Sequence, residues 1–108
     1  MIKIDKTSII SNNAIIEDNV EIGPFCIIEE DVTIKKGTVI KPYVQVMSNT
    51  IIGENNVIHQ GSILGGIPQD LKYNNEKTSL IIGNNNIIRE FCTLNKGTDC
   101  SLQTKIGN

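Results

Sequence analysis

Every sixth residue from Ile4 to Leu64 is a branched aliphatic. The series runs through eleven positions without a gap: Ile4, Ile10, Ile16, Ile22, Ile28, Ile34, Ile40, Val46, Ile52, Ile58 and Leu64. An amphipathic helix places its apolar residues three and four positions apart, and a half-buried strand alternates with a period of two, so neither explains this spacing. A strict six-residue repeat is typical of a β-solenoid, in which short strands joined by turns each direct one aliphatic side chain inward. The sequence therefore predicts an all-β fold built from hexapeptide repeats.

The fourth position of each hexad, counted from the aliphatic, has the composition of a tight corner. It mostly carries residues that adopt a positive φ at low steric cost, namely Asn13, Asn19, Asp31, Gly37, Asn49, Asn55, Gly61, Asn85 and Gly97. The exceptions Thr7, Phe25 and Tyr43 are separated by three hexads each. This second period predicts three hexads per coil, and so a triangular prism. We expect one corner in three to be built differently from the others, although Gly61 interrupts the series.

The six-residue register breaks once. Positions 70 and 76 are acidic, and the aliphatic series resumes at Ile82, Ile88 and Leu94. Phe91 looks like another member of the bulky corner, but it follows Tyr43 by eight hexads, which is not a multiple of three. If the two hexads from Asp70 to Ile81 are left out of the count, Phe91 follows Tyr43 by two full coils. The sequence thus predicts a looped-out excursion near 70–81, after which the coil resumes on the face that it left.

Length and composition narrow the class of protein. The 108 residues form one hexapeptide-repeat domain, 1–108, with a net charge of −2 and no cluster of basic residues, which argues against nucleic-acid binding. Apolar runs are too short for a membrane span or a signal peptide, so we expect a cytoplasmic protein. Cys26 and Cys92 share an inward-facing position of the repeat, which indicates free thiols. No cap for the solenoid is visible, so we expect the N-terminal part of a longer chain.

Few residues in the sequence suggest a catalytic or ligand-binding role. His59 is the sole histidine and follows an inward aliphatic directly, so we expect it on the outer wall as a surface residue. One histidine excludes a three-histidine zinc site within one chain, and we expect neither metal nor cofactor. Gln69, Asp70 and Lys72 lie together at the root of the predicted loop. Their amide, carboxylate and ammonium groups suit sugar hydroxyls and phosphates, although a simple polar loop would have the same composition.

Four motifs resemble the bacterial UDP-N-acetylglucosamine acyltransferases of lipid A synthesis. They are Ile22-Gly-Pro-Phe-Cys26, Pro68-Gln-Asp-Leu-Lys-Tyr73, Ile88-Arg-Glu-Phe91 and Thr93-Leu-Asn-Lys-Gly-Thr98, and the Gln69-to-Tyr73 stretch is the specific one. The resemblance covers the whole chain. It implies a left-handed parallel β-helix that forms a homotrimer. It also implies transfer of an (R)-3-hydroxyacyl group from acyl carrier protein to the 3-hydroxyl of UDP-N-acetylglucosamine.

The resemblance also implies roles for individual residues. Asp70 is assigned to the sugar, and Gln69 and Lys72 to the sugar or the acyl donor. Asn95 stands where the family usually has a histidine that supports substrate binding, so a hydrogen bond can remain while titration near neutral pH is lost. The general-base histidine of the family is expected beyond Asn108, so residues 1–108 should be inactive alone.

Two other functions remain open from the sequence. One is a nucleotide-sugar N-acyltransferase that uses coenzyme A, since a deprotonated amine needs less help from a base. The other is a non-catalytic solenoid that serves as a structural module. Competition between coenzyme A and carrier-protein donors separates the first from the O-acyltransferase.

Overall fold

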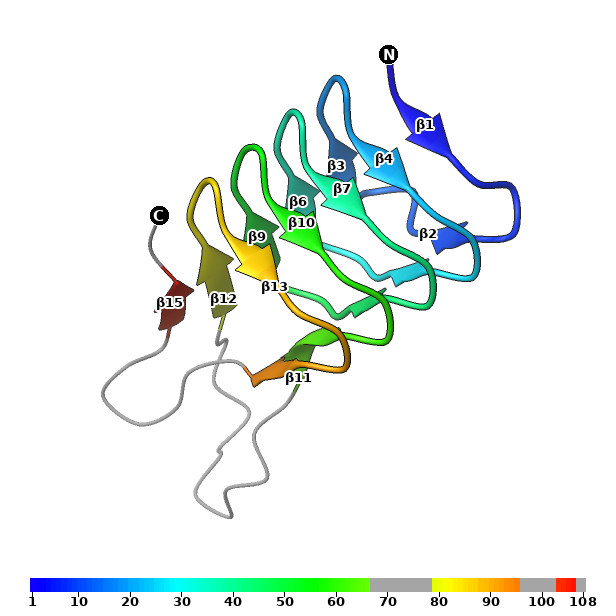
Figure 1. Cartoon of the computed structure of the whole chain (residues 1–108). Helices are drawn as coiled ribbons and strands as arrows, with labels where there is room; N and C mark the ends of the chain where they lie inside the picture. The colour runs from blue at the N-terminus through cyan, green and yellow to red at the C-terminus, as the bar shows by residue number, and fades with distance from the viewer. Residues whose placement is uncertain (67–78, 96–102, 107–108) are drawn as a thin grey trace.

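The computed structural model describes residues 1–66, 79–95 and 103–106. They form a prism of three parallel sheets, with the chain visiting each sheet once per coil (Figure 1). Sheet A contains β1 (Lys3–Ile4), β4 (Glu21–Ile22), β7 (Val39–Ile40), β10 (Val57–Ile58) and β13 (Ile87–Ile88). Sheet B contains β2 (Ile9–Ile10), β5 (Ile27–Ile28), β8 (Gln45–Val46), β11 (Ile63–Gly66) and β14 (Thr93–Asn95). Sheet C contains β3 (Ile15–Ile16), β6 (Thr33–Ile34), β9 (Thr50–Ile52), β12 (Ser79–Ile82) and β15 (Gln103–Ile106).

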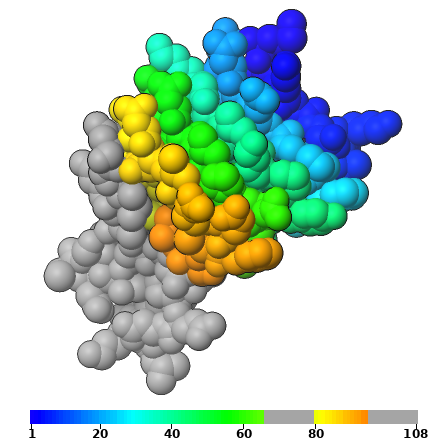
Figure 2. All heavy atoms as spheres, in the orientation of Figure 1, coloured from blue at the N-terminus to red at the C-terminus, as the bar shows by residue number. Residues whose placement is uncertain are grey.

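The register of the strands explains the aliphatic period. In sheet A, Ile4 pairs with Ile22, Ile22 with Ile40 and Ile40 with Ile58, so each inward aliphatic stacks on the one three hexads later. From Ile22 to Leu64 every member of the series is at most 3% exposed. Stacked aliphatics of this kind stabilise a solenoid coil by coil. The predicted all-β, left-handed, three-sided β-helix is confirmed, and in Figure 2 its coils lie as successive bands of colour.

The corners differ from the prediction in one respect. Phe25, Tyr43 and Phe91 have φ values of 59°, 62° and 57°. These values match the 55–61° at five other corners, Asn19, Asp31, Asn49, Asn55 and Asn85. The expectation that one corner in three is built differently is therefore wrong for the backbone. The turn is the same at these corners, and only the side chain that it carries changes.

Gly61 interrupts the aromatic series because the ring of Phe91 occupies the space that a side chain at Gly61 would need. Gly61 has a φ of +76°, and a Cβ placed on it would collide with the ring of Phe91 from the next coil. The rings of Phe25 and Tyr43 stack one coil apart on the same edge, with centroids 5.3 Å apart. The edge between sheets A and B thus carries an aromatic column in which Phe91 covers a glycine.

The excursion has the predicted length and slightly different bounds. Thr50 pairs with Leu80 and Ile52 with Ile82, a step of five hexads where an uninterrupted coil takes three. The two additional hexads match the interval between Gly66, the end of β11, and Ser79, the start of β12. Residues 79–81 therefore belong to the wall, because an unbroken apolar run, Leu80 to Ile82, lets the strand begin earlier than the hexad count indicates.

The return point also differs from the prediction. The chain leaves at the end of a strand of sheet B and returns as a strand of sheet C, so it resumes on the next face and not on the face that it left. A second change of register follows, since Ile82 pairs with Ile106, four hexads later instead of three.

Candidate functional site

The edge between sheets B and C is where the excursion begins and ends. β11 and β12 contact each other there. Gly66, the last residue of β11, pairs with Asn95, the last residue of β14. The structure therefore brings the backbone of Asn95 to the root of the excursion. The predicted site residues Gln69, Asp70 and Lys72 lie outside the described residues.

A β-bulge marks the exit of the chain. Ile63 and Leu64 pair in order with Thr93 and Leu94, but the next pair joins Gly66 to Asn95. Gly65 is thus an additional residue on β11, with a φ of +82° that strongly favours glycine. A Cβ on Gly65 would collide with the hydroxyl oxygen of Thr50 in the preceding coil. The bulge therefore fits closely against Thr50.

Inside the prism, polar side chains follow a simple rule. The donor is a polar side chain four positions after an inward aliphatic. It donates a hydrogen bond to a backbone carbonyl of the next coil. That carbonyl belongs to the residue directly after the inward aliphatic of the next coil. The described residues give five such bonds: Ser8 to Gly23 (2.6 Å), Cys26 to Lys41 (3.1 Å), Thr38 to Gly53 (2.6 Å), Asn56 to Gly83 (2.7 Å) and Ser62 to Arg89 (2.8 Å). Each coil is thereby tied to the next through its interior as well as through its backbone.

Thr50 occupies the same position of the hexad and breaks the rule. By analogy its acceptor would be the carbonyl of Gly65, the bulged residue. Thr50 is fully buried, yet its hydroxyl has no hydrogen-bond partner. The amide of Leu80, which would be the analogous donor to this hydroxyl, donates instead to the carbonyl of Asn49 at 3.1 Å. The unpaired hydroxyl therefore coincides with the bulge at the exit of the chain.

Asn86 is a different case at the same hexad position. Its Nδ2 also lacks a partner. The acceptor that the rule assigns to it follows Ile106 and lies outside the described residues, so the rule is not tested there. Thr50 is thus the position at which the assigned acceptor lies within the described residues and the hydrogen bond is still absent.

Neither Thr50 nor Gly65 was predicted from the sequence as part of the site. The available signal was the pair Gly65-Gly66 directly after an inward aliphatic. In the other described coils, the inward aliphatic is followed by one outward residue and then by a corner. Glycine in a strand often marks a bulge. Thr50 gave no signal by itself, because serine and threonine occur at the same hexad position in coils where they are paired.

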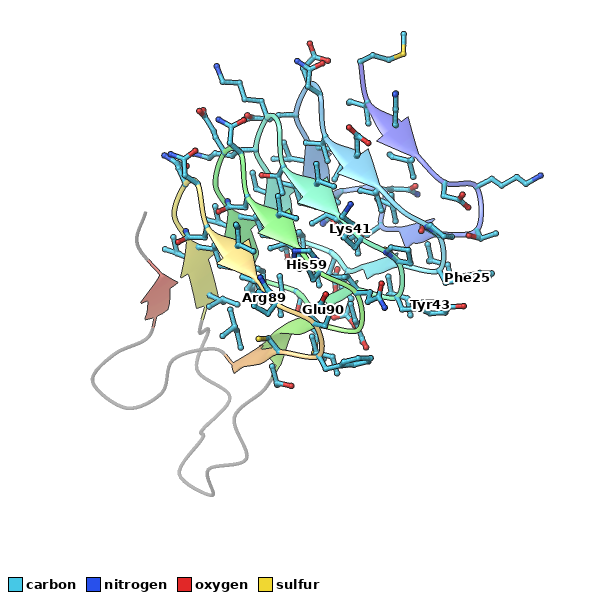
Figure 3. The ribbon with its side chains drawn as sticks, viewed as in Figure 1. Phe25, Lys41, Tyr43, His59, Arg89 and Glu90 are labelled. Carbon is cyan, nitrogen blue, oxygen red and sulfur yellow. The ribbon has the colours of Figure 1, made fainter. Side chains whose placement is uncertain are left out.

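A polar column lies on the outer wall beside the edge between sheets A and B. Lys41, His59 and Arg89 follow the inward aliphatics of successive coils, and Figure 3 shows them in order along one side of the prism. His59 Nδ1 lies 3.6 Å from Glu90 Oε2, with the two side chains 28% and 43% exposed. Exposed pairs of this kind contribute at most about 1 kcal/mol. The outward placement of His59 is confirmed, and it lies at a different edge from Asn95.

The cysteines behave as interior residues. Cys26 and Cys92 are free thiols, and Cys26 is 1% exposed. Burial raises the pKa of the Cys26 thiol, although hydrogen bonds involving Val44, Ser8 and Tyr43 partly oppose the shift. Cys26 is therefore a protonated packing residue at neutral pH and not a nucleophile.

Neither a metal cluster nor a membrane-spanning helix occurs in the described part of the chain. No three histidine, cysteine or acidic side chains gather within residues 1–66, 79–95 and 103–106 in a way that could hold a metal ion. Within the same ranges, no helix is long and apolar enough to cross a bilayer.

Comparison with known proteins agrees with this architecture. Residues 31–66 match the family described as bacterial transferase hexapeptide (six repeats). The chain is 48% identical over 110 residues to the acyl-[acyl-carrier-protein]–UDP-N-acetylglucosamine O-acyltransferase of Psychrobacter sp., covering 100% of this chain and 42% of that protein. It is 43% identical to the enzyme of the same name from Rickettsia bellii, covering 97% of this chain and 38% of that protein.

Solved structures give the same result. LpxA from Acinetobacter baumannii superposes with a TM-score of 0.94 at 49% identity, over 97% of this chain and 41% of that one. LpxA from Bacteroides fragilis, a UDP-N-acetylglucosamine acyltransferase, also gives 0.94, at 38% identity over 96% of this chain and 41% of that one. The chain spans about two fifths of the length of these relatives. It is a left-handed hexapeptide β-helix that is similar in sequence and fold, over its whole length, to part of the UDP-N-acetylglucosamine acyltransferases.

Proposed function

We propose that this chain is the sugar-nucleotide-binding β-helix of an acyltransferase that moves an (R)-3-hydroxyacyl group from acyl carrier protein to the 3-hydroxyl of UDP-N-acetylglucosamine. One observation carries the proposal. The pairing of Gly66 with Asn95 joins the root of the segment that holds Gln69 and Asp70 to the residue at the family's histidine position. The names of the relatives supply the substrates.

The side chains have distinct tasks in this proposal. The Asp70 carboxylate accepts hydrogen bonds from sugar hydroxyls, which a carboxylate can do in two directions. Gln69 donates and accepts, and the Lys72 ammonium pairs with a phosphate or with the acyl donor. Asn95 keeps a hydrogen bond to substrate without changing its charge near neutral pH. Gln69 follows Gly66 by three positions, which span at most about 11 Å, so covalent geometry permits these groups to meet.

The reaction also needs groups from elsewhere. His59 lies beside Glu90 on the edge between sheets A and B, away from the pairing of Gly66 with Asn95. We therefore propose that the general base, which removes the proton of the sugar hydroxyl as it attacks the thioester, comes from another part of the complete protein. We further propose a cytoplasmic homotrimer that uses acyl carrier protein as donor.

Acyl transfer tests the proposal. The complete protein is incubated with 3-hydroxyacyl carrier protein and UDP-N-acetylglucosamine, and the acylated sugar nucleotide is measured. We expect turnover by the complete protein and none by residues 1–108. Asp70→Asn should raise KM for the sugar nucleotide, whereas Asp31→Asn, at a corner of the wall, serves as the matched control. Absence of transfer by the complete protein, or turnover by residues 1–108 alone, contradicts the proposal.

A further inference from the structure

The edge between sheets A and B combines backbone strain with exposed aromatic rings. Phe25, Tyr43 and Phe91 form the aromatic column, and each has a φ between 57° and 62°. A bulky residue is strained at such a φ, whereas asparagine and glycine adopt it at low cost. The three rings are 53%, 63% and 76% exposed, so packing within the chain offsets little of the strain. Contacts among the described residues therefore do not account for aromatic residues at these corners.

The other two edges carry short polar side chains at their corners, and these interact within the chain. Asn13 Nδ2 donates to Asp31 Oδ1 at 3.3 Å, and Asn13 Oδ1 accepts from the Asp31 amide at 3.1 Å. Asn55 Oδ1 lies over Gly37 of the preceding coil. In Figure 3, by contrast, the aromatic side chains labelled on the edge between sheets A and B point away from the prism. The prism can thus close its corners without aromatic residues, which favours a role for the column outside the single chain.

The apolar surface continues from the aromatic column onto the outer face of sheet B. The outward residues of the described strands of this sheet are uncharged: Ile9, Ile27, Gln45, Ile63 and Thr93. The three isoleucines among them are 67%, 40% and 38% exposed. Sheet A differs, because its first two strands present Lys3 and Glu21 at the equivalent positions. Aromatic residues without charges are typical of the core of an interface between proteins, and a contiguous exposed apolar patch marks such a surface.

A second copy of the chain is the partner that this edge suits. In a cyclic homo-oligomer whose axis runs along the prisms, the edge nearest the axis meets the same edge of the other copies. A charged corner would then face its own like charge, whereas an aromatic ring can stack on its counterpart. The corner position of this edge is uncharged in every described coil: Thr7, Phe25, Tyr43, Gly61 and Phe91. Charge begins beside the column, with Lys41 and Arg89, as in the polar rim of an interface.

We propose that the aromatic column is the surface through which the chain contacts its own copies, at the axis of the homotrimer. The inference rests on the proposed function, which takes the complete protein to be a homotrimer, and it goes further by naming the contact surface. Burial of the rings on assembly offsets the strain of their corners. The edge between sheets B and C is a different corner of the triangle, so this arrangement keeps it away from the axis.

Replacement of two rings in the complete protein is the direct test. Phe25→Asn and Tyr43→Asn together install the residue found at other corners, so circular dichroism should show a retained fold. Sedimentation equilibrium, in a urea concentration that half-dissociates the wild type, should show a dissociation constant raised at least tenfold. Ile15→Asn with Ile51→Asn is the matched control, since it removes two exposed side chains of sheet C, and we expect a change below twofold.

Three results of this experiment overturn the proposal. A ring variant that assembles within twofold of the wild type assigns the rings to a different partner. Equal losses in the ring variant and the sheet C control show that the edge between sheets A and B has no special part in assembly. A ring variant that does not fold shows that the rings serve the single chain.

Photo-cross-linking provides a second measurement that does not depend on a loss of stability. Phe91, which is 76% exposed, is replaced by p-benzoylphenylalanine in the complete protein. Irradiation should join two copies, and mass spectrometry should place the second end of the cross-link on the aromatic column or on the outer face of sheet B. Cross-links confined to the same chain, or joined to sheet C of a second copy, refute the proposal.

The outcomes for the wild-type protein separate this inference from the proposed activity. A protein that transfers acyl groups but sediments as a monomer refutes the contact surface and leaves the activity standing. A trimer that transfers no acyl group refutes the activity, and the ring variant then decides the contact surface by itself.

Discussion

Replacement by valine should destabilise the chain at Thr38 but not at Thr50. Both threonines occupy the same hexad position and are 0% exposed. The Thr38 hydroxyl donates to Gly53 O at 2.6 Å and accepts from the amide of Asn56 at 3.2 Å. Thr38→Val leaves both of these groups unpaired, which costs about 1–3 kcal/mol. Thr50→Val removes a hydroxyl that has no partner, so we expect no loss and up to about 2 kcal/mol of gain.

The difference between the two variants is large enough to measure. About 1 kcal/mol shifts Tm by roughly 4–8 °C in a domain of this size, so the Tm values of the two variants should differ by at least about 4 °C. Urea unfolding followed by circular dichroism gives the free energies, and an unchanged m-value shows that the unfolded state is comparable. Equal destabilisation by Thr38→Val and Thr50→Val would mean that the Thr50 hydroxyl is paired, which would refute this reasoning.

Three further outcomes follow from the packing. Gly61→Ala should destabilise the chain by about 1–2 kcal/mol through its φ of +76° and the Phe91 ring, and Phe91→Ala in the same chain should recover part of this in a double-mutant cycle. Tyr43→Asn removes an aromatic residue from a positive φ but also loses the ring stacking on Phe25. The two effects oppose each other, so the free energy of unfolding should change by less than about 1 kcal/mol. Because burial raises the pKa of the Cys26 thiol, the stability that this thiol contributes is fully present at neutral pH and falls as the pH rises into the alkaline range. Iodoacetamide trapping followed by mass spectrometry should show slow alkylation of this thiol in the native protein.

Much of the architecture can be predicted from the sequence because the repeat is local. The inward aliphatics fix the face of each strand, and the interval from Tyr43 to Phe91 is enough to reveal an excursion of two hexads. The bounds differ because Leu80, Ile81 and Ile82 are all aliphatic, so the hexad pattern does not say where the strand begins. The pairing of Leu80 with Thr50, a contact between coils, decides it.

The corners and the site are harder to predict for different reasons. Aromatic bulk at Phe25 suggests another kind of turn, but stacking between coils permits an aromatic at the same positive φ. The bulge at Gly65 depends on the register with β14, which lies beyond the whole excursion in sequence. The unpaired state of Thr50 depends in turn on that bulge. Such features arise from long-range pairing, and a six-residue period contains no information about it.

The adjacency of exit and return makes the wall insensitive to what is inserted between them. β11 and β12 remain neighbours after the excursion, so an insertion of another length at this edge leaves every stacked aliphatic in place. Doubling the length of a flexible insertion costs only about 0.6 kcal/mol of closure entropy. The segment inserted at this edge can therefore be exchanged for another without any change to the six-residue repeat of the prism.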